Sequence, residues 1–287
     1  MDCKPTLYPE MHRVNRAMDR PKPQRPAIVE TQPNSACAEL YPAAASSSAP
    51  LAEVGPIRAI LFDKDGTLVD FQRSWGPAAL EVMQHLAGGR GAAYQRLVAA
   101  SRYVEAEQCF LPDSPLIAQP TSVYGALWAT ALGRPANVEF FAEIDRLMCN
   151  ATTRHLAAIG DPKALMTFLA ARGYRLGMFT NDAEITARAH ARKLGLDQLL
   201  EFIAGYDSGF GAKPDPDPVL AFARTIGVPP SEIAVVGDTV LDLAAARAAG
   251  AMAIGVLTGP ASSPDLAACA DAVLASPAEL AAWLSNR

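Results

Sequence analysis

The chain has 287 residues, of which 50% are hydrophobic and 19% charged, a composition typical of globular proteins with one or two domains. Its net charge of −5, from 25 basic and 30 acidic residues, argues against nucleic acid or an anionic membrane as a partner. Without a run of about 18 apolar residues, no membrane span is predicted. The five cysteines are scattered and form no CxxC pair, so neither a disulfide framework nor a zinc knuckle is predicted. This pattern favours a reducing, cytoplasmic compartment.

The first 54 residues differ in composition from the rest of the chain. They contain no glycine, eight prolines and the low-complexity run Ala43–Pro50. Residues 1–54 are therefore predicted to be a disordered, Pro/Ala/Ser-rich extension. A secretory signal would need a basic start and an apolar stretch, and an organellar transit peptide would be poor in acids such as Asp2 and Glu10. We expect the folded protein to begin near Pro56.

From Pro56 onward, short apolar segments alternate with amphipathic segments, which predicts an α/β fold with a Rossmann-like parallel sheet flanked by helices. Each candidate strand is short and continuously apolar, as strands buried on both faces tend to be. The predicted strands are Ile57–Phe62, Tyr174–Phe179, Phe202–Ala204, Ile233–Val236 and Met252–Val256.

The interval between the first two predicted strands is too long for a simple crossover. It exceeds a hundred residues, whereas a βαβ unit takes roughly 30 or more. Apolar residues within it recur at helical spacing. We therefore predict an α-helical cap domain inserted at residues 73–156, with the α/β core formed by residues 56–72 and 157–287.

Two carboxylates, Asp63 and Asp65, directly follow the first strand. Ligands bind at the carboxyl ends of strands in open parallel sheets, and two adjacent acids can act as nucleophile or metal ligand and as proton carrier. Gly66 allows the chain to turn sharply beneath them. A simple Asx-turn is the structural alternative. A calcium loop is disfavoured because Ser74 occupies the position that requires glutamate.

Polar side chains also follow three later strands. Thr180 and Asn181 come after the second strand, where a hydroxyl can hold a phosphoryl oxygen. Lys213, before Pro214, can neutralise charge on a transferring phosphoryl group. Asp238 lies at the tip of the Ile233–Val236 strand, with Asp242 one helical turn away. Such a density of carboxylates calls for a cation, and oxygen ligands favour Mg²⁺. Each of these elements alone also fits a surface loop or a helix cap.

Taken in order, these motifs resemble those of the haloacid dehalogenase-like hydrolase superfamily, and specifically its phosphoglycolate phosphatase and β-phosphoglucomutase branch, which carries a helical cap. The motifs are Asp63-x-Asp65-Gly66-Thr67-Leu68, Thr180, Lys213-Pro214-Asp215-Pro216 and Gly237-Asp238-Thr239-x-x-Asp242. The resemblance covers the chain from Pro56 to its end.

The resemblance implies a role for each matching residue. Asp63 attacks phosphorus and becomes an aspartyl-phosphate, and Asp65 protonates the leaving oxygen and later deprotonates water. Thr180, Asn181 and Lys213 hold the phosphoryl group. Mg²⁺ is bound by the Asp63 carboxylate, the Asp65 main-chain carbonyl and Asp238, while Asp242 supports the metal through water or orients Lys213.

One residue departs from the family pattern. Lys64 stands where the family usually has an aromatic or aliphatic residue. From strand alternation we expect its side chain to point away from Asp63 and Asp65, with no catalytic role. Trp75 and His190 are expected to be a core residue and a helix-face histidine.

The predicted function is a Mg²⁺-dependent phosphatase acting on a small phosphorylated metabolite, as a monomer or homodimer, with 2-phosphoglycolate as the best single substrate. A phosphomutase and a non-catalytic scaffold are the alternatives, while a dehalogenase has no use for Asp65 as an acid. Five cap arginines are candidates for a clamp on a substrate carboxylate, namely Arg73, Arg90, Arg96, Arg102 and Arg134.

Overall fold

The computed structural model describes residues 56–286, so the predicted extension of residues 1–54 lies outside the described part. A six-stranded sheet with strand order β5-β4-β1-β6-β7-β8 forms the centre, and all its neighbouring strands are parallel. The strands are β1 (Ala59–Asp63), β4 (Arg175–Phe179), β5 (Phe202–Ala204), β6 (Ile233–Gly237), β7 (Met252–Val256) and β8 (Ala272–Leu274). This confirms the predicted α/β class, and of the six strands of this sheet only the three-residue β8 was not predicted.

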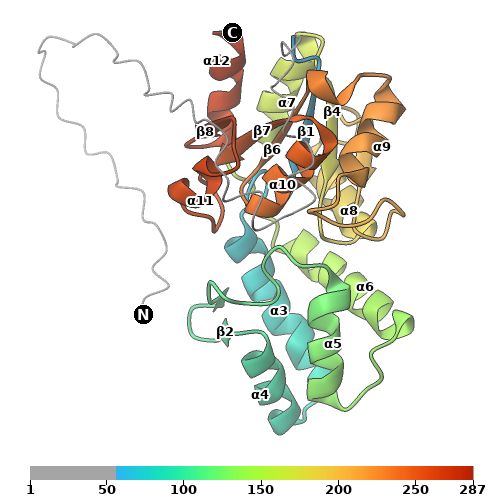
Figure 1. Cartoon of the computed structure of the whole chain (residues 1–287). Helices are drawn as coiled ribbons and strands as arrows, with labels where there is room; N and C mark the ends of the chain where they lie inside the picture. The colour runs from blue at the N-terminus through green and yellow to red at the C-terminus, as the bar shows by residue number, and fades with distance from the viewer. Residues whose placement is uncertain (1–55, 287) are drawn as a thin grey trace, which may run out of the picture.

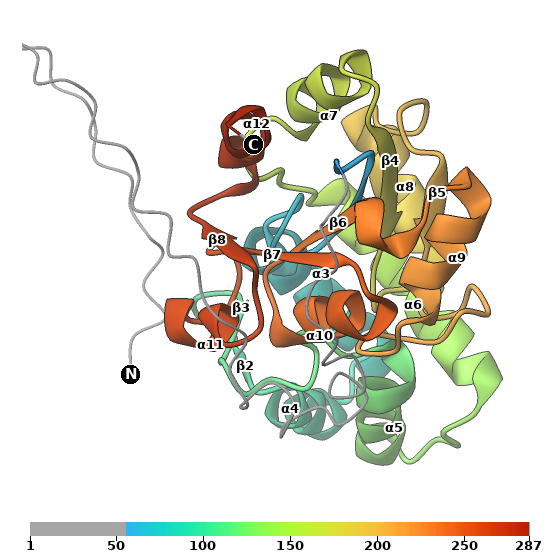
Figure 2. The ribbon, with the colours of Figure 1, turned by 45° about the horizontal axis from the view of Figure 1, so that its top comes forward.

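Helices cover both faces of this sheet (Figure 2). On one face lie α7 (Pro162–Ala171), α8 (Glu184–Leu194) and α12 (Leu280–Ser285), and on the other lie α9 (Asp217–Ile226), α10 (Val240–Ala249) and α11 (Ser263–Ala267). Two short 3₁₀ helices, Pro230–Glu232 and Pro277–Glu279, precede β6 and α12.

The alternation of side chains along β1 divides the apolar core into two layers. Ile60 and Phe62 pack with Met166 of α7, whereas Leu61 packs with Phe222 of α9 on the opposite face. All of these side chains are fully buried. Strands buried on both faces have no polar alternation, which explains the continuous apolar segments in the sequence.

A helical unit lies at one end of the sheet body, below it in Figure 1. It consists of α3 (Phe71–Ala87), α4 (Gly91–Ala100), the hairpin of β2 (Tyr103–Val104) and β3 (Cys109–Phe110), α5 (Thr121–Leu132) and α6 (Val138–Arg154). These elements share an apolar cluster of their own that includes Met83, Trp128 and Ile144. The hairpin was not predicted, and the division of the chain into domains at residues 73 and 156 stays a prediction.

The start of α3 places the helical unit against the end of β1. Asp70 caps this helix, because its side chain accepts a hydrogen bond from the main-chain N–H of Arg73 at 3.0 Å. Only the short turn after Asp63 separates the strand from the helix. The first turns of α3 therefore lie next to the carboxyl ends of the strands. None of the helices in residues 56–286 is long and apolar enough to cross a membrane.

Candidate active site

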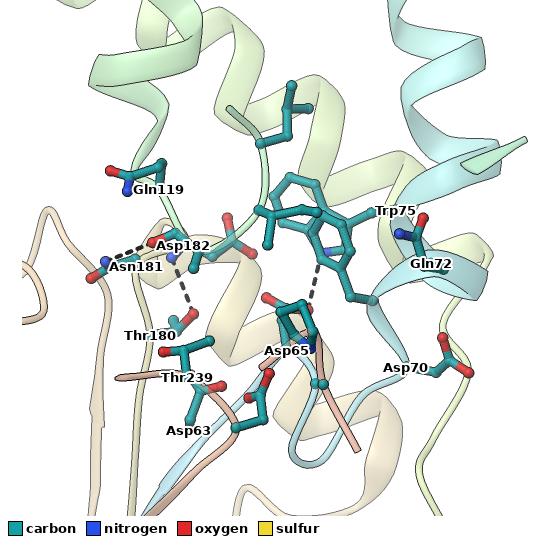
Figure 3. Close-up of a pocket in the computed structure, with 18 of the residues that line it drawn as sticks. Asp63, Asp65, Asp70, Gln72, Trp75, Gln119, Thr180, Asn181, Asp182 and Thr239 are labelled. Atoms are coloured by element: carbon teal, nitrogen blue, oxygen red, sulfur yellow. Dashed lines mark hydrogen bonds between the residues drawn. The ribbon is translucent and has the colours of Figure 1, made fainter. Parts of the chain in front are cut away.

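A pocket lies between the carboxyl ends of the central strands and the helical unit (Figure 3). Its sheet side is formed by polar residues that end or follow β1, follow β4 and β6, or lie in the loop before α9. These are Asp63, Asp65, Thr180, Asn181, Asp182, Lys213 and Asp238. Its helical side is formed by neutral residues of α3 and of the loop before α5, namely Phe71, Gln72, Trp75, Leu116, Ile117, Ala118 and Gln119. The fold thus brings together at one site the predicted acids and the predicted lysine.

Asp63 and Lys213 form a buried ion pair at the base of this pocket. Asp63 is the last residue of β1 and is 3% exposed, and Lys213 Nζ donates hydrogen bonds to Asp63 Oδ1 and, at 2.6 Å, to Asp242 Oδ1. Burial raises the pKa of Asp63 to about 6, although Lys213 opposes that shift. Burial alone would lower the pKa of Lys213, but Asp242 and Asp63 hold it above its usual range. The lysine is therefore a permanent positive charge beside the candidate nucleophile.

Asp242 contacts Lys213 with one oxygen and caps α10 with the other. Its second oxygen accepts from the Thr239 main-chain N–H at 2.9 Å and from the Thr239 hydroxyl at 2.6 Å. Both carboxylate oxygens are thus engaged within the protein. Of the two predicted roles for Asp242, this geometry matches the orientation of Lys213.

Asp238 has the surroundings of a metal ligand. It is 1% exposed, and Thr67 Oγ1 donates to its Oδ1 at 2.9 Å, but its Oδ2 has no hydrogen-bond partner among the described residues. Gly66 has φ +84°, and a Cβ on it would lie 2.1 Å from that same oxygen, so only glycine fits the close turn. Burial raises the pKa of Asp238 well above its usual value, and Asp63 adds to the shift.

Carboxylate oxygens of Asp63, Asp238 and Asp242 lie within 4.8 Å of one another. Buried like charges at this spacing repel one another. Lys213 neutralises Asp63 and Asp242, whereas Asp238 has no basic partner among the described residues. An unpartnered oxygen on Asp238 and an all-oxygen donor set fit a hard divalent cation. The acidic cluster is therefore suited to a metal ion, as the sequence analysis predicted.

Thr180 and Asn181 follow β4 at the same edge. Thr180 lines the pocket, and its Oγ1 accepts from the main-chain N–H of Asp182 at 3.1 Å. The Asn181 amide accepts from the Lys213 main-chain N–H at 2.8 Å and donates to the carbonyls of Lys213 and Ala118, at 3.1 and 3.0 Å. Asn181 therefore fixes the loop that carries Lys213, and its predicted part in phosphate binding stays a prediction.

The expected orientation of Lys64 is wrong. Its side chain is fully buried, and its Nζ lies 2.5 Å from Asp65 Oδ2 and 2.9 Å from Asp182 Oδ2. The strand ends at Asp63, and the main-chain N–H groups of Leu68 and Val69 donate to the carbonyl of Lys64, so strand alternation does not extend to this turn. Although burial opposes it, Asp182 and Asp65 raise the pKa of Lys64 to about 12.

Two more residues of the site were missed by the sequence analysis. Trp75, expected only to fill the core, donates its indole N–H to Asp65 Oδ1 at 3.0 Å (Figure 3). Asp182 holds Lys64 from the other side. An acid two residues after Thr180, just beyond the predicted strand, was the signal in the sequence, but without the tertiary structure nothing links it to Lys64. His190 lies on a helix, as expected, but it is fully buried, and its Nδ1 lies 3.4 Å from Lys64 Nζ.

The predicted arginine clamp is absent from this pocket. None of the five candidate arginines lines it, and Lys213 is the one basic residue among its lining residues in the described part of the chain. Arg90 and Arg96 donate to main-chain carbonyls of the helical unit, while Arg102 and Arg134 pair with Asp113 and Glu143. Arg90, Arg102 and Arg134 lie outside the helices, and the sequence gave no information on whether these connections meet the pocket.

The fold and this site define a known class of enzymes. A match to the haloacid dehalogenase-like hydrolase family spans residues 57–250, and the chain belongs to this family. A phosphoglycolate phosphatase from Rhodospirillum rubrum is 31% identical over 79% of this chain and 90% of its own length. One from Chromobacterium violaceum is also 31% identical, over 80% of this chain and 97% of its own length. These relatives confirm the predicted superfamily branch and the predicted class of enzyme, a phosphoric monoester hydrolase.

Solved structures share the fold of this chain. CbbY from Rhodobacter sphaeroides in complex with phosphate has a TM-score of 0.61 at 23% identity, over 78% of this chain and 96% of that one, which shows the shared fold alone. A hydrolase of the same family from Deinococcus radiodurans, with bound phosphate and sodium, has a TM-score of 0.57 at 26% identity, over 80% of this chain and 96% of that one.

Proposed function

We propose that this protein is a Mg²⁺-dependent phosphatase that hydrolyses a small phosphate monoester through an aspartyl-phosphate on Asp63. The observation that carries the proposal is the buried Asp63 at the end of β1, in contact with Lys213 and facing the same pocket as Asp65. An anionic carboxylate attacks an anionic ester only where positive charge neutralises the phosphoryl oxygens. Lys213 supplies such a charge at the attacking group.

The reaction proceeds in two displacements. A carboxylate oxygen of Asp63 bonds to phosphorus while the bond to the ester oxygen breaks, and Asp65 gives its proton to the departing alkoxide. Asp65 then takes a proton from a water molecule, which attacks phosphorus, releases inorganic phosphate and restores Asp63. Thr180 and Lys213 hold the phosphoryl oxygens throughout. The Asp63 and Asp238 carboxylates and the Asp65 carbonyl would hold Mg²⁺, which neutralises phosphoryl charge when bound.

The first substrate to test is 2-phosphoglycolate, because the relatives above bear the name phosphoglycolate phosphatase. One observation favours a second class, esters of uncharged alcohols. The helical side of the pocket presents no basic side chain among its lining residues, while Asp70 adds a negative charge at its margin. A substrate carboxylate in that position would have to bind through neutral groups such as the Gln119 amide.

A matched pair of esters separates these two substrate classes. Phosphate release with Mg²⁺ is measured for 2-phosphoglycolate and for 2-hydroxyethyl phosphate, which carries a hydroxymethyl group in place of the carboxylate. Asp63→Asn is the negative control for both. A higher kcat/KM for 2-phosphoglycolate supports the carboxylated substrate, and a higher value for the hydroxyl ester supports the uncharged class. If the wild-type protein releases phosphate from no ester of a wider metabolite panel, the proposed function is wrong.

A phosphomutase uses the same core residues but returns the phosphoryl group to the sugar. The named relatives are phosphatases, so this alternative is not favoured. Incubation with a hexose 1-phosphate distinguishes the two activities, because a mutase yields the isomerised sugar phosphate and a phosphatase yields free sugar and phosphate. A cytoplasmic location and a monomeric or homodimeric state stay predictions.

A further inference from the structure

Behind the pocket lies a buried charged layer that the proposed mechanism does not use. Its centre is Lys64, which is 0% exposed and lies within hydrogen-bond or ion-pair distance of Asp65 and Asp182. His190 Nδ1 lies 3.4 Å from the same ammonium group, and its Nε2 lies 3.0 Å from the Thr152 hydroxyl. A buried ammonium group that loses hydration is retained only where it has partners such as these.

The Asp65 carboxylate is held from two directions. Lys64 Nζ donates to Oδ2 at 2.5 Å, and Trp75 Nε1–H donates to Oδ1 at 3.0 Å from α3. Figure 3 shows the Trp75 ring standing over Asp65. The side chain of Asp65 is still 16% exposed, so one edge of the carboxylate faces the pocket. Two donors, one on each oxygen, fix the plane of the carboxylate while leaving this edge available to substrate.

We infer that Lys64 is a positioning residue of the acid–base step. Lys64 is anchored by Asp182, and together with Trp75 it holds the Asp65 carboxylate toward the leaving-group oxygen. The inference rests on the proposed function, because Asp65 needs a fixed orientation only if it exchanges a proton with substrate and water. Proton transfer depends steeply on the distance and alignment of donor and acceptor. Lys64 is buried and joined to Asp182 by an ion pair, so its side chain does not move between rotamers as an exposed lysine does. It therefore fixes the orientation of Asp65 before substrate binds.

The choice of leaving group separates a positioning role from a merely structural one. Loss of a structural ion pair would not change the ratio of kcat/KM between esters with different leaving groups. An alkoxide leaves only if Asp65 protonates it, whereas p-nitrophenolate is stable as an anion and leaves without a proton. Misplacing Asp65 should therefore lower kcat/KM for an alkyl phosphate and spare p-nitrophenyl phosphate. A general loss of structure would lower both values in parallel.

The experiment compares Lys64→Met with wild-type protein on 2-hydroxyethyl phosphate and p-nitrophenyl phosphate at saturating Mg²⁺. Methionine retains the length of the side chain and removes the ammonium group. We expect kcat/KM for the alkyl ester to fall at least about 30-fold and that for the aryl ester to change by less than about 3-fold. Asp65→Asn should also lower kcat/KM more for the alkyl ester than for the aryl ester. Because it removes the acid itself, its effect is the largest that Lys64→Met can reach. Lys163→Met, an exposed lysine of α7, is the matched control and should leave both values unchanged.

Two further variants keep the inference falsifiable if Lys64→Met does not fold, as judged by circular dichroism and thermal melting. Asp182→Asn weakens the anchor of Lys64, and Trp75→Phe removes the other donor to Asp65 while keeping a ring. Each should give the same leaving-group selectivity at about 3- to 10-fold. A folded variant that lowers both esters equally, or neither, overturns the positioning role. If wild-type protein binds p-nitrophenyl phosphate but hydrolyses neither it nor 2-hydroxyethyl phosphate, the proposed function is wrong, and this inference is wrong with it.

Discussion

The two sides of the pocket are built in different ways. The sheet side carries buried charges, and among residues 56–286 each charged group there has a charged or hydrogen-bonding partner, apart from one oxygen of Asp238. The helical side carries neutral side chains, and the side-chain amide of Gln72 there is hydrogen-bonded to the main-chain N–H and carbonyl of Phe110. We expect the sheet side to cleave the phosphate ester bond whatever the rest of the substrate is. We expect the helical side to contact the rest of the substrate through shape and neutral groups.

The largest expected effect comes from Asp63→Asn, which removes the anionic attacking oxygen from the sheet side. Turnover should fall by at least about 1,000-fold for every ester, because covalent catalysis is lost for all of them alike. The fold should persist, since burial already disfavours the charge on Asp63 and the amide is of equal size. Phosphate release and thermal melting measure the two effects. Asp197→Asn, at an exposed site, is the matched control, and a variant of Asp63 with near-normal turnover would contradict the assignment of the nucleophile.

Removal of divalent metal should have the next largest effect. A chelator should lower turnover at least about 100-fold, and added Mg²⁺ should restore it. Independently of activity, Mg²⁺ should raise the Tm of wild-type protein, because ligand binding stabilises the folded state. Asp238→Asn should abolish this rise in Tm and be at least as stable as wild-type protein without metal, since the amide removes a charge that burial disfavours. An unchanged Mg²⁺-dependent rise in Tm in that variant would show that Asp238 is not a ligand.

Asp242→Asn tests the support of Lys213. The amide can still cap α10 but no longer neutralises the ammonium group of Lys213, which lies 2.6 Å away. We expect kcat to fall by about 10- to 100-fold, with the same factor for alkyl and aryl esters. Asp271→Asn provides a comparison, because Asp271 pairs with Arg247 away from the pocket and its loss should leave kcat unchanged. A change confined to one class of ester would place Asp242 in substrate selection instead.

A smaller effect is expected in the pH dependence of stability, from His190 behind the sheet side. Burial, with the charges of Lys64 and Lys193, lowers the pKa of His190 to about 2 from 6.5. Below pH 6.5 His190 therefore binds a proton in the unfolded chain but stays neutral in the folded protein. The free energy of unfolding falls as the pH falls toward the folded pKa. At pH 5 this loss is about 2 kcal/mol relative to pH 7.

Urea unfolding of wild-type protein and His190→Gln at pH 7 and pH 5 measures this loss. The glutamine variant should lack the contribution of His190 and lose correspondingly less stability on acidification. His85→Gln, on an exposed face of α3, is the control and should keep the wild-type dependence on pH. Equal losses in wild-type protein and His190→Gln would mean that His190 is not held neutral.

The smallest effect should come from the helical side. Gln119 lines the pocket and its amide has no hydrogen-bond partner among the described residues, which leaves it free to contact a substrate. Gln119→Ala should change the ratio of kcat/KM between 2-phosphoglycolate and 2-hydroxyethyl phosphate by about 2- to 5-fold. Its activity on p-nitrophenyl phosphate should stay within error of wild type. Gln198→Ala, at an exposed site on the sheet body, is the control. A parallel loss of kcat/KM on all three esters would contradict the expectation that the helical side affects only substrate selection.

The sequence by itself determined the sheet and the acids at its edge. Strands buried on both faces are continuously apolar, and parallel strands end at one edge, so the positions of Asp63, Asp238 and Lys213 along the chain were enough to predict that they meet. The long interval before the second strand likewise predicted helices between β1 and β4. These inferences succeeded because they depend on local periodicity and on the common direction of the strands.

Only the tertiary structure decided which side chains support the chemistry and which face the substrate. Lys64 turns toward Asp65 because the strand ends at Asp63, and the contact with Asp182 joins residues that are far apart in sequence. The helical spacing in the cap did not show which residues face the pocket, because it gives the spacing of residues but not the rotation of a helix against its neighbour. That rotation is set by packing, here the apolar cluster around Trp128, and it places Trp75 at the pocket.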